Sequence, residues 1–346
     1  MSLRITFQPW GETLAEMADA GRRAEEAGAE VLWTSELHRS ATVSAAALAA
    51  TTTRARIGTS IALAFARSPM ITALEALDLD ELSGGRFVLG LGSGVQRLNE
   101  DWHNARFGKP VPHLREVVRN IRLFWSTCAT GAEMRVDGEY EPMRVRGYQR
   151  PFAVPAAAIP VYLAAMGPLM TRLAGEIADG WISLELCSPA YLAERVMPDL
   201  TAGIARTPGR TRADLDVVVS ACCSIADDVA VARRRSAGLV GFYASVKTYA
   251  EFFAFHGLAA DQRAVVDAFR DRGSSDDLAD SVSAPMVDAL TMTGTRDGVV
   301  ARVKAYDGLA DSVKLSPPTH GLPAAETRAA QEEIIALIGE LTGASA

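Results

Sequence analysis

The sequence predicts an α/β fold, a (β/α)8 or TIM barrel with a helical insertion before the last βα unit. Short β-rich runs alternate with longer helical patterns along the 346 residues, as expected for parallel strands joined by helical crossovers. Residues 86–92 read Arg-Phe-Val-Leu-Gly-Leu-Gly without polar alternation, which is typical of a strand buried on both faces. Barrels of this kind reach this length as one unit, so residues 1–346 are expected to form a single domain.

Turn and capping residues divide the chain into elements. Gly28 ends the first helix because glycine allows the left-handed conformation, and Ser68-Pro69 opens a later helix because proline suits the first helical position. Residues 130–155 lose the helical period and predict an inserted loop or hairpin. Helical sequence from Asp227 to Asp288 is too long for one crossover and predicts extra helices. The predicted strands are 3–8, 30–35, 55–63, 86–92, 159–164, 181–184, 216–225 and 312–316, and the main predicted helices are 12–27, 68–83, 113–128, 168–178, 295–309 and 324–341.

Charge and cysteine content argue against several classes of function. The formal net charge is -7, and apart from Arg233–Arg235 no basic cluster is present, so neither nucleic acid nor an anionic membrane is expected as a partner. The run Arg233–Arg235 is expected to be a solvated helix face. The four cysteines form no Cys-x-x-Cys pair, so no structural metal is expected. The chain starts without a signal-peptide pattern and contains no run of membrane-spanning length, which predicts a cytoplasmic protein.

Polar and small residues follow the predicted strands, where the active sites of such barrels are built. The residues at these strand ends are Gln8, Trp10, Ser35, Glu36, Ser60, Ile61, Ser93, Gly94, Ala165–Gly167 and Glu185. The glycines of 90–94 do not match the dinucleotide spacing because position 95 is valine, which argues against a Rossmann nicotinamide dehydrogenase. They allow backbone N–H groups to approach an anion beside the Ser93 hydroxyl. A tight turn without a ligand is the alternative.

Acid–base groups are few near these strand ends. No histidine stands in a recognisable nucleophile motif, so hydrolase chemistry has no visible basis. Glu36 and His38 are the candidate catalytic residues for proton transfer. The alternatives are that Glu36 only complements a helix dipole and that His38 is simply solvated.

The chain resembles the luciferase-like monooxygenase superfamily through motifs that span nearly its whole length. These are Trp33–Glu36, Ser68-Pro69, Leu82–Gly94, Ile159–Pro168 and Ala178–Trp181. Within the superfamily it is most similar to the branch that uses coenzyme F420, which includes methylenetetrahydromethanopterin reductase and related actinobacterial oxidoreductases. Two departures stand out. Glu36-Leu37 occupies the place where many deazaflavin relatives have Asp-His, and Thr6 stands where the reductase has an acid.

The resemblance implies a deazaflavin ring across the barrel mouth that exchanges hydride with a small-molecule substrate, while Glu36 or His38 handles any proton. It also implies a non-proline cis peptide at Ser60-Ile61 and commonly a homodimer. The residues implied to bind the cofactor are Ser35, Ser60, Ile61, Ser93, Gly94, Asn99, Ala164, Ala165, Met166 and Gly167, and the implied substrate wall is Trp10, Phe65 and Trp102. The alternative activity on the same fold is an FMN-dependent monooxygenase. A non-catalytic coenzyme carrier is a further rival.

Overall fold

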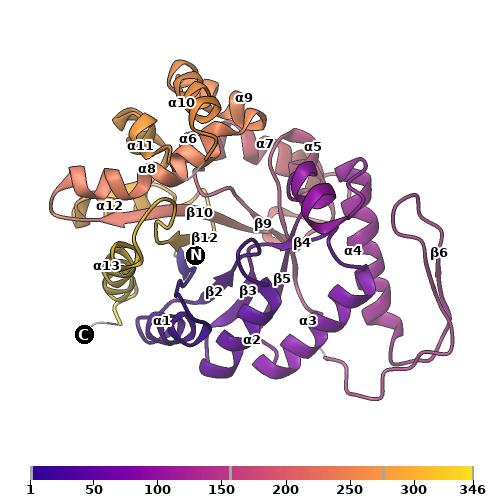
Figure 1. The fold of residues 1–346 in the computed structure, drawn as a ribbon. Coiled ribbons are helices and arrows are strands. Elements are labelled where there is room, and N and C mark those ends of the chain that lie inside the picture. The colour runs from indigo at the N-terminus through magenta and orange to yellow at the C-terminus, as the bar shows by residue number, and fades with distance from the viewer. Residues whose placement is uncertain (1–2, 156–157, 275–276, 345–346) are drawn as a thin grey trace. The chain divides into compact units, whose positions relative to one another are not determined.

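The computed structural model describes residues 3–155, 158–274 and 277–344 (Figure 1). Its internal contacts group into two compact units, each assembled from separate stretches of the chain. Unit 1 comprises Met1–Glu30, Ser183–Arg195 and Val217–Ala346, and unit 2 comprises Val31–Ile182 and Val196–Asp216. The expectation of a single domain stays a prediction.

Unit 2 is built on a parallel sheet in which neighbouring strands follow the chain order. Its strands, in spatial order, are β2 (Val31–Thr34), β3 (Arg56–Thr59), β5 (Phe87–Gly92), β8 (Val161–Ala164) and β9 (Gly180–Ile182), and β4 (Ala62–Leu63) pairs with β5. Its helices are α2 (Ala41–Thr51), α3 (Pro69–Ser83), the π-helical turn η1 (Leu98–Trp102), α4 (Pro110–Thr127), α5 (Pro168–Ile177), α7 (Met197–Ile204) and η3 (Arg212–Asp214). α2 and α3 pack against β3 and β5 (Figure 1).

Unit 1 contains further parallel strands. Its strands, in spatial order, are β11 (Met292–Gly294), β10 (Asp216–Ile225), β12 (Ser312–Ser316) and β1 (Arg4–Phe7). Its longer helices are α1 (Leu14–Glu26), α8 (Val229–Ser245), α10 (Ala259–Arg272), α12 (Arg296–Lys304) and α13 (Ala324–Thr342). Its short helices are α6 (Pro189–Tyr191), η4 (Lys247–Tyr249), α9 (Ala250–Phe255), η5 (Ala279–Ser281) and α11 (Ala284–Leu290), and η2 (Leu192–Val196) runs from this unit into unit 2.

Local sequence signals produce several of the expected elements. The side chain of Ser68 accepts a hydrogen bond from the N–H of Ile71, Pro69 starts α3, and Gly84 ends it with a left-handed φ of 68°. Every residue of β5 is buried, as the continuous apolar run predicts. The stretch 130–155 contains the antiparallel hairpin of β6 (Met134–Val136) and β7 (Met143–Val145). These predictions are confirmed.

Two differences from the predicted elements concern strands. The predicted strand 55–63 is divided: β3 ends at Thr59, β4 starts at Ala62, and the Ser60-Ile61 peptide between them is cis, as the resemblance implies. β11 is not among the predicted strands. It forms because β10 has ten residues and uses Val218–Cys222 to pair with β12, which leaves Cys223–Ile225 to pair with β11. A three-residue strand is too short to show a periodic pattern.

Candidate functional site

Glu36 holds the turn between β3 and β4. Its backbone N–H donates to the carbonyl of Ile61 at 3.1 Å, and its carboxylate accepts from the N–H of Leu63 at 2.8 Å. Arg67 binds both carboxylate oxygens, one of them at 2.7 Å. The turn is also fixed from β2, because the N–H of Ser60 donates to Thr34 O at 2.6 Å. The turn 60–63 is therefore tied to the end of β2 by backbone and side chain.

Hydrogen bonding determines the protonation of Glu36. Burial alone would raise its pKa, but the hydrogen bonds from Arg67 and from the Leu63 N–H outweigh this effect and hold the pKa below its usual value. Glu75 lies 3.5 Å from Arg67, and there burial prevails and raises the pKa of the carboxyl. Glu36 is accordingly an ionised group in a saturated ion pair at neutral pH.

Two further sequence candidates follow β2 on the protein surface. Ser35 and His38 are both exposed. His38 lies in a bend that leads to α2, whose N-cap is Ser40. The structure brings Ser35, Glu36, Ser60 and Ile61 to the same strand ends, with His38 two residues further along the chain.

The loop after β5 is held by a buried asparagine. The side-chain amide of Asn99 donates to Ser93 O at 2.8 Å and to Val95 O at 2.9 Å. Asn99 is 0% exposed, and its Oδ1 has no hydrogen-bond partner among the described residues. Gly94 has a φ of 61°, a conformation that favours glycine. The loop therefore has a fixed shape and a buried acceptor that a ligand hydroxyl could satisfy.

Close packing explains the glycines of β5. A Cβ at Gly90 would lie 1.8 Å from Thr59 O, and a Cβ at Gly92 would lie 2.9 Å from the side chain of Ile61. β5 therefore approaches β3 and the Ser60-Ile61 turn more closely than a strand with side chains at these positions could. The Gly-rich run serves this packing as well as the loop at Gly94.

The third predicted segment, Ala164–Gly167, links β8 to α5. The indole N–H of Trp181 donates to Ala165 O at 3.0 Å, and Gly167 is the N-cap of α5 with a φ of 76°. Gly167 is exposed, and no heavy atom lies within 4 Å of a Cβ built on it. The segment thus has an anchored start and an open end at the N-terminus of a helix, which favours anions.

The three residues of the predicted aromatic wall differ in exposure and contacts. Phe65 is 6% exposed and stacks on His113 with ring centroids 3.8 Å apart. Trp102 is 66% exposed on η1. Trp10 belongs to unit 1, where its backbone N–H donates to Gln331 Oε1 at 2.7 Å. Phe65 is therefore a packing residue, and the role of the two tryptophans stays a prediction.

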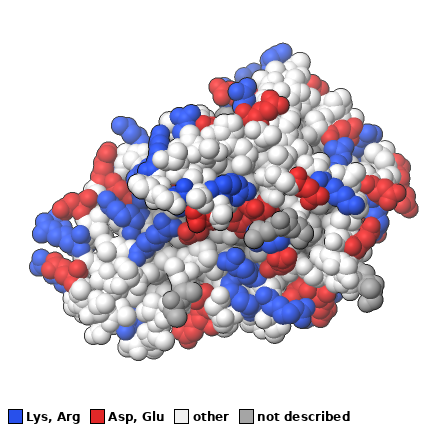
Figure 2. All heavy atoms as spheres, turned by 180° about the vertical axis from the view of Figure 1, so that it is seen from behind, with Lys and Arg blue, Asp and Glu red and all other residues white. Residues whose placement is uncertain are grey.

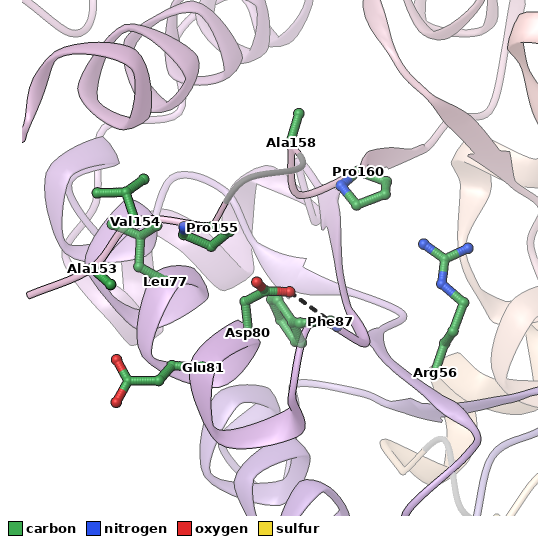
Figure 3. Close-up of a pocket in the computed structure, with 11 residues that line it drawn as sticks. Arg56, Leu77, Asp80, Glu81, Phe87, Ala153, Val154, Pro155, Ala158 and Pro160 are labelled. Carbon is green, nitrogen blue, oxygen red and sulfur yellow. Dashed lines mark hydrogen bonds between the residues drawn. The ribbon is translucent and has the colours of Figure 1, made fainter.

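A pocket of about 490 Å³ lies at the other end of the unit 2 strands (Figure 3). Arg56 and Phe87, which begin β3 and β5, line it together with Pro160, which precedes β8. Its one deeply buried carboxyl, Asp80, accepts from the N–H of Phe87 at 3.4 Å, and burial raises the pKa of that carboxyl. None of the predicted site residues lines this pocket. It is not the candidate active site, because catalytic groups of such sheets gather at the carboxyl ends of the strands.

A polar cluster in unit 1 is missing from the sequence-based candidates. Lys314 lies on β12, and its ammonium contacts Gln8 and Glu185. Gln8 and Glu185 are recognised from the sequence as strand-end residues, but Lys314 is not. The available signal is a lysine between Val313 and Leu315 in the short strand 312–316.

Surface charge and cysteine chemistry give no further site. Acidic and basic side chains are interspersed on the face seen in Figure 2, and Arg233 and Arg234 of the basic run pair with Asp288 and Glu326. Cys128, Cys187, Cys222 and Cys223 are buried free thiols. In the described ranges no group of His, Cys, Asp or Glu could hold a metal ion, and no helix there is long and apolar enough to cross a membrane. The predicted homodimer and cytoplasmic location stay predictions.

The chain is similar to known proteins over most of its length. The family model of luciferase-like monooxygenases matches residues 4–312. A protein of Mycobacterium tuberculosis, provisionally named a coenzyme F420-dependent oxidoreductase, is 32% identical over 89% of this chain and 92% of its own length.

Two solved structures bear on the fold. The coenzyme F420-dependent tetrahydromethanopterin reductase of Methanopyrus kandleri superposes with a TM-score of 0.81 at 23% identity, covering 98% of this chain and 97% of that one. A type II Baeyer-Villiger monooxygenase component of Pseudomonas putida in complex with FMN gives a TM-score of 0.66 at 16% identity, with 98% of each chain covered. These likenesses confirm the predicted (β/α)8 barrel. The family match over residues 4–312 makes the chain a member of the luciferase-like monooxygenase family of enzymes.

Proposed function

We propose that this enzyme binds coenzyme F420 and transfers hydride between it and a small organic substrate. The observation that carries the proposal is the Ser60–Leu63 turn, which Glu36 and Arg67 hold against the glycines of β5. A rigid turn that packs against glycines, which have no side chain, is a suitable support for a flat ring system. The F420-dependent name of the 32% identical relative gives independent support.

The residues present fit such a coenzyme. The ring would lie against Ser60 and Ile61, next to Ser35. The phosphate-bearing tail would follow Ser93 and Gly94, where backbone N–H groups can approach an anion, and the buried Oδ1 of Asn99 would accept from a tail hydroxyl. The segment that would cover the tail and ring edge is Ala164, Ala165, Met166 and Gly167. When bound, the deazaflavin supplies a hydride-transferring carbon that reacts poorly with oxygen.

The chain's own groups would position the reactants and exclude water. Glu36 is one of two sequence candidates for proton transfer, yet its carboxylate is occupied by Arg67 and Leu63. We therefore assign Glu36 to positioning the turn. His38 is exposed and can exchange a proton with water, so it is the better of the two candidates for proton transfer.

FMN-dependent oxygenation is the second candidate function. The likeness to an FMN-bound Baeyer-Villiger monooxygenase component favours it. The 32% identical relative carries an F420-dependent name, and F420 is therefore the preferred cofactor.

The Asn99→Leu variant tests the proposed tail site. It removes the hydrogen bonds to Ser93 O and Val95 O together with the buried acceptor. We expect the dissociation constant for F420, measured by fluorescence quenching, to rise about tenfold, which corresponds to roughly 1.4 kcal/mol. Gln96→Leu is the matched control, because Gln96 is exposed on the same loop. Equal dissociation constants for both variants and the wild type would contradict the site.

A further inference from the structure

The pocket at the amino ends of the unit 2 strands is a second place where a small molecule could bind (Figure 3). Its volume of about 490 Å³ lies within the usual range of ligand pockets, roughly 300–1,000 Å³. The described residues that line it all belong to unit 2. They lie at the ends of β3 and β5 opposite to Ser60 and Ser93, where the coenzyme is proposed to bind. A ligand in this pocket would therefore be distinct from the coenzyme.

The walls of the pocket are mainly apolar. Leu77 of α3 and Phe87 of β5 are 2% and 1% exposed, so this part of the wall belongs to the packed core and holds its shape. Val154, Pro155 and Pro160 complete the apolar lining. Ligand pockets typically combine such walls with a small number of polar groups that fix the orientation of the ligand.

Asp80 is the buried polar group of the pocket. It is 6% exposed, and its carboxylate points into the pocket in Figure 3. Its Oδ1 accepts from the N–H of Phe87 at 3.4 Å, and its Oδ2 has no hydrogen bond or ion pair among the described residues. Burial raises the pKa of this carboxyl, and no cation is among the groups that lower it. Asp80 therefore lacks a counter-ion in the part of the chain that the structure describes.

Arg56 is the cation of the pocket. It is the first residue of β3 and is half-buried. Its guanidinium has no hydrogen bond or ion pair within residues 3–155, 158–274 and 277–344. Figure 3 shows it apart from the Asp80 carboxylate, on the side of Pro160. Glu81 also lines the pocket, but its side chain is 71% exposed and lies 4.0 Å from Arg150. Two opposite charges thus line one apolar pocket without pairing with each other.

The separation of the two charges selects a ligand class. An ammonium group would supply the missing counter-ion of Asp80, and a carboxylate would match Arg56, whose planar guanidinium can bind both carboxylate oxygens. An apolar chain between the two groups would lie against Leu77 and Phe87. We propose that this pocket binds a small zwitterion whose ammonium and carboxylate are joined by an apolar chain. Arg56 disfavours a simple amine, and Asp80 disfavours a simple carboxylate, because each would meet a like charge.

Isothermal titration calorimetry of the full chain with simple probes tests the proposal. The probes are 4-aminobutanoate, 6-aminohexanoate and 8-aminooctanoate. We expect at least one of them to bind saturably with a dissociation constant on the order of 1 mM, as the small size of these molecules allows. The alkylamine and the alkanoate of the same chain length should each bind about tenfold more weakly, since each lacks one charge-assisted contact.

The variants Asp80→Asn and Arg56→Gln locate the ligand. Asparagine still accepts from the N–H of Phe87 but carries no charge. Asp80→Asn should weaken the zwitterion about tenfold without weakening the alkanoate, and Arg56→Gln should weaken the zwitterion about tenfold without weakening the alkylamine. Asp137→Asn and Arg135→Gln are the matched controls, because both residues are exposed and lie outside the pocket. Circular dichroism reports whether each variant folds, and Arg56→Gln carries the test if Asp80→Asn does not.

Three outcomes would overturn the inference. The first is that none of the three zwitterions binds saturably below about 20 mM. The second is that the zwitterion and its singly charged analogues bind equally well, which would mean that only apolar contact is involved. The third is that the affinity is unchanged in the folded variants at Asp80 and Arg56, which would place the ligand elsewhere. Coenzyme F420 is absent from all these measurements, so their failure would leave the proposed function untouched.

Discussion

Arg67→Met is expected to lower the free energy of unfolding by about 3 kcal/mol at pH 7, as found when one partner of a buried ion pair is removed. Arg67 is the cationic partner of Glu36 and also faces Glu75. The side chains of Arg67 and Glu36 are only 20% and 9% exposed. Without the guanidinium, the buried Glu36 carboxylate loses its counter-ion, and so does Glu75, whose side chain is 32% exposed. Urea unfolding of the variant and the wild type measures the difference.

The pH dependence of this loss has a definite sign. Arg67 and Leu63 hold the pKa of Glu36 below 4.5 in the folded chain. The stabilisation from Glu36 is therefore complete above about pH 4.5 and is lost as the pH falls through the lowered pKa. The difference in the free energy of unfolding between wild type and Arg67→Met should become smaller from pH 7 to pH 4. Arg135→Met, on the exposed face of β6, is the control. A difference in the free energy of unfolding below about 1 kcal/mol, as for a surface ion pair, would contradict this account of Glu36. A difference that does not change with pH would also contradict it.

Gly90→Ala is expected to destabilise the fold by about 3 kcal/mol or more, at the upper end of overpacking effects. The added methyl group would stand 1.8 Å from Thr59 O. The strand cannot move away easily, because Thr59 Oγ1 donates to Gly90 O at 2.7 Å and accepts from the Gly90 N–H at 2.9 Å. Thermal and urea unfolding followed by circular dichroism measure the effect.

Gly298→Ala in α12 is the matched control for this variant. There the new Cβ meets only Thr295 Oγ1, at 3.3 Å, and alanine favours the helix over glycine. We expect the free energy of unfolding to change by less than about 1 kcal/mol. If Gly90→Ala were as stable as Gly298→Ala, the close approach of β5 to β3 described here would be wrong.

The periodic part of the fold is predictable from the sequence because burial leaves a local pattern. The apolar run 86–92 predicts β5, and Ser68-Pro69 with Gly84 predicts the ends of α3. The sequence does not predict β11, because three residues are too few to show a periodic pattern of hydrophobicity. Its partner is the last part of β10, Cys223–Ile225.

The sequence predicts where the candidate site residues lie, but not which residues form ion pairs with them. Strand ends identify Glu36 and Glu185, because active-site groups gather there. Their partners, Arg67 and Lys314, stand 31 and 129 residues later in the chain. No local pattern links such residues. The assignment of Glu36 to positioning therefore needs the structure.

The most direct test of the proposed cofactor compares the affinity of the chain for two coenzymes. The purified chain is titrated separately with F420 and with FMN, and binding is followed by fluorescence quenching. The proposal predicts saturable F420 binding and an FMN dissociation constant at least about tenfold higher, a difference of roughly 1.4 kcal/mol. Tight FMN binding without measurable F420 binding would contradict it.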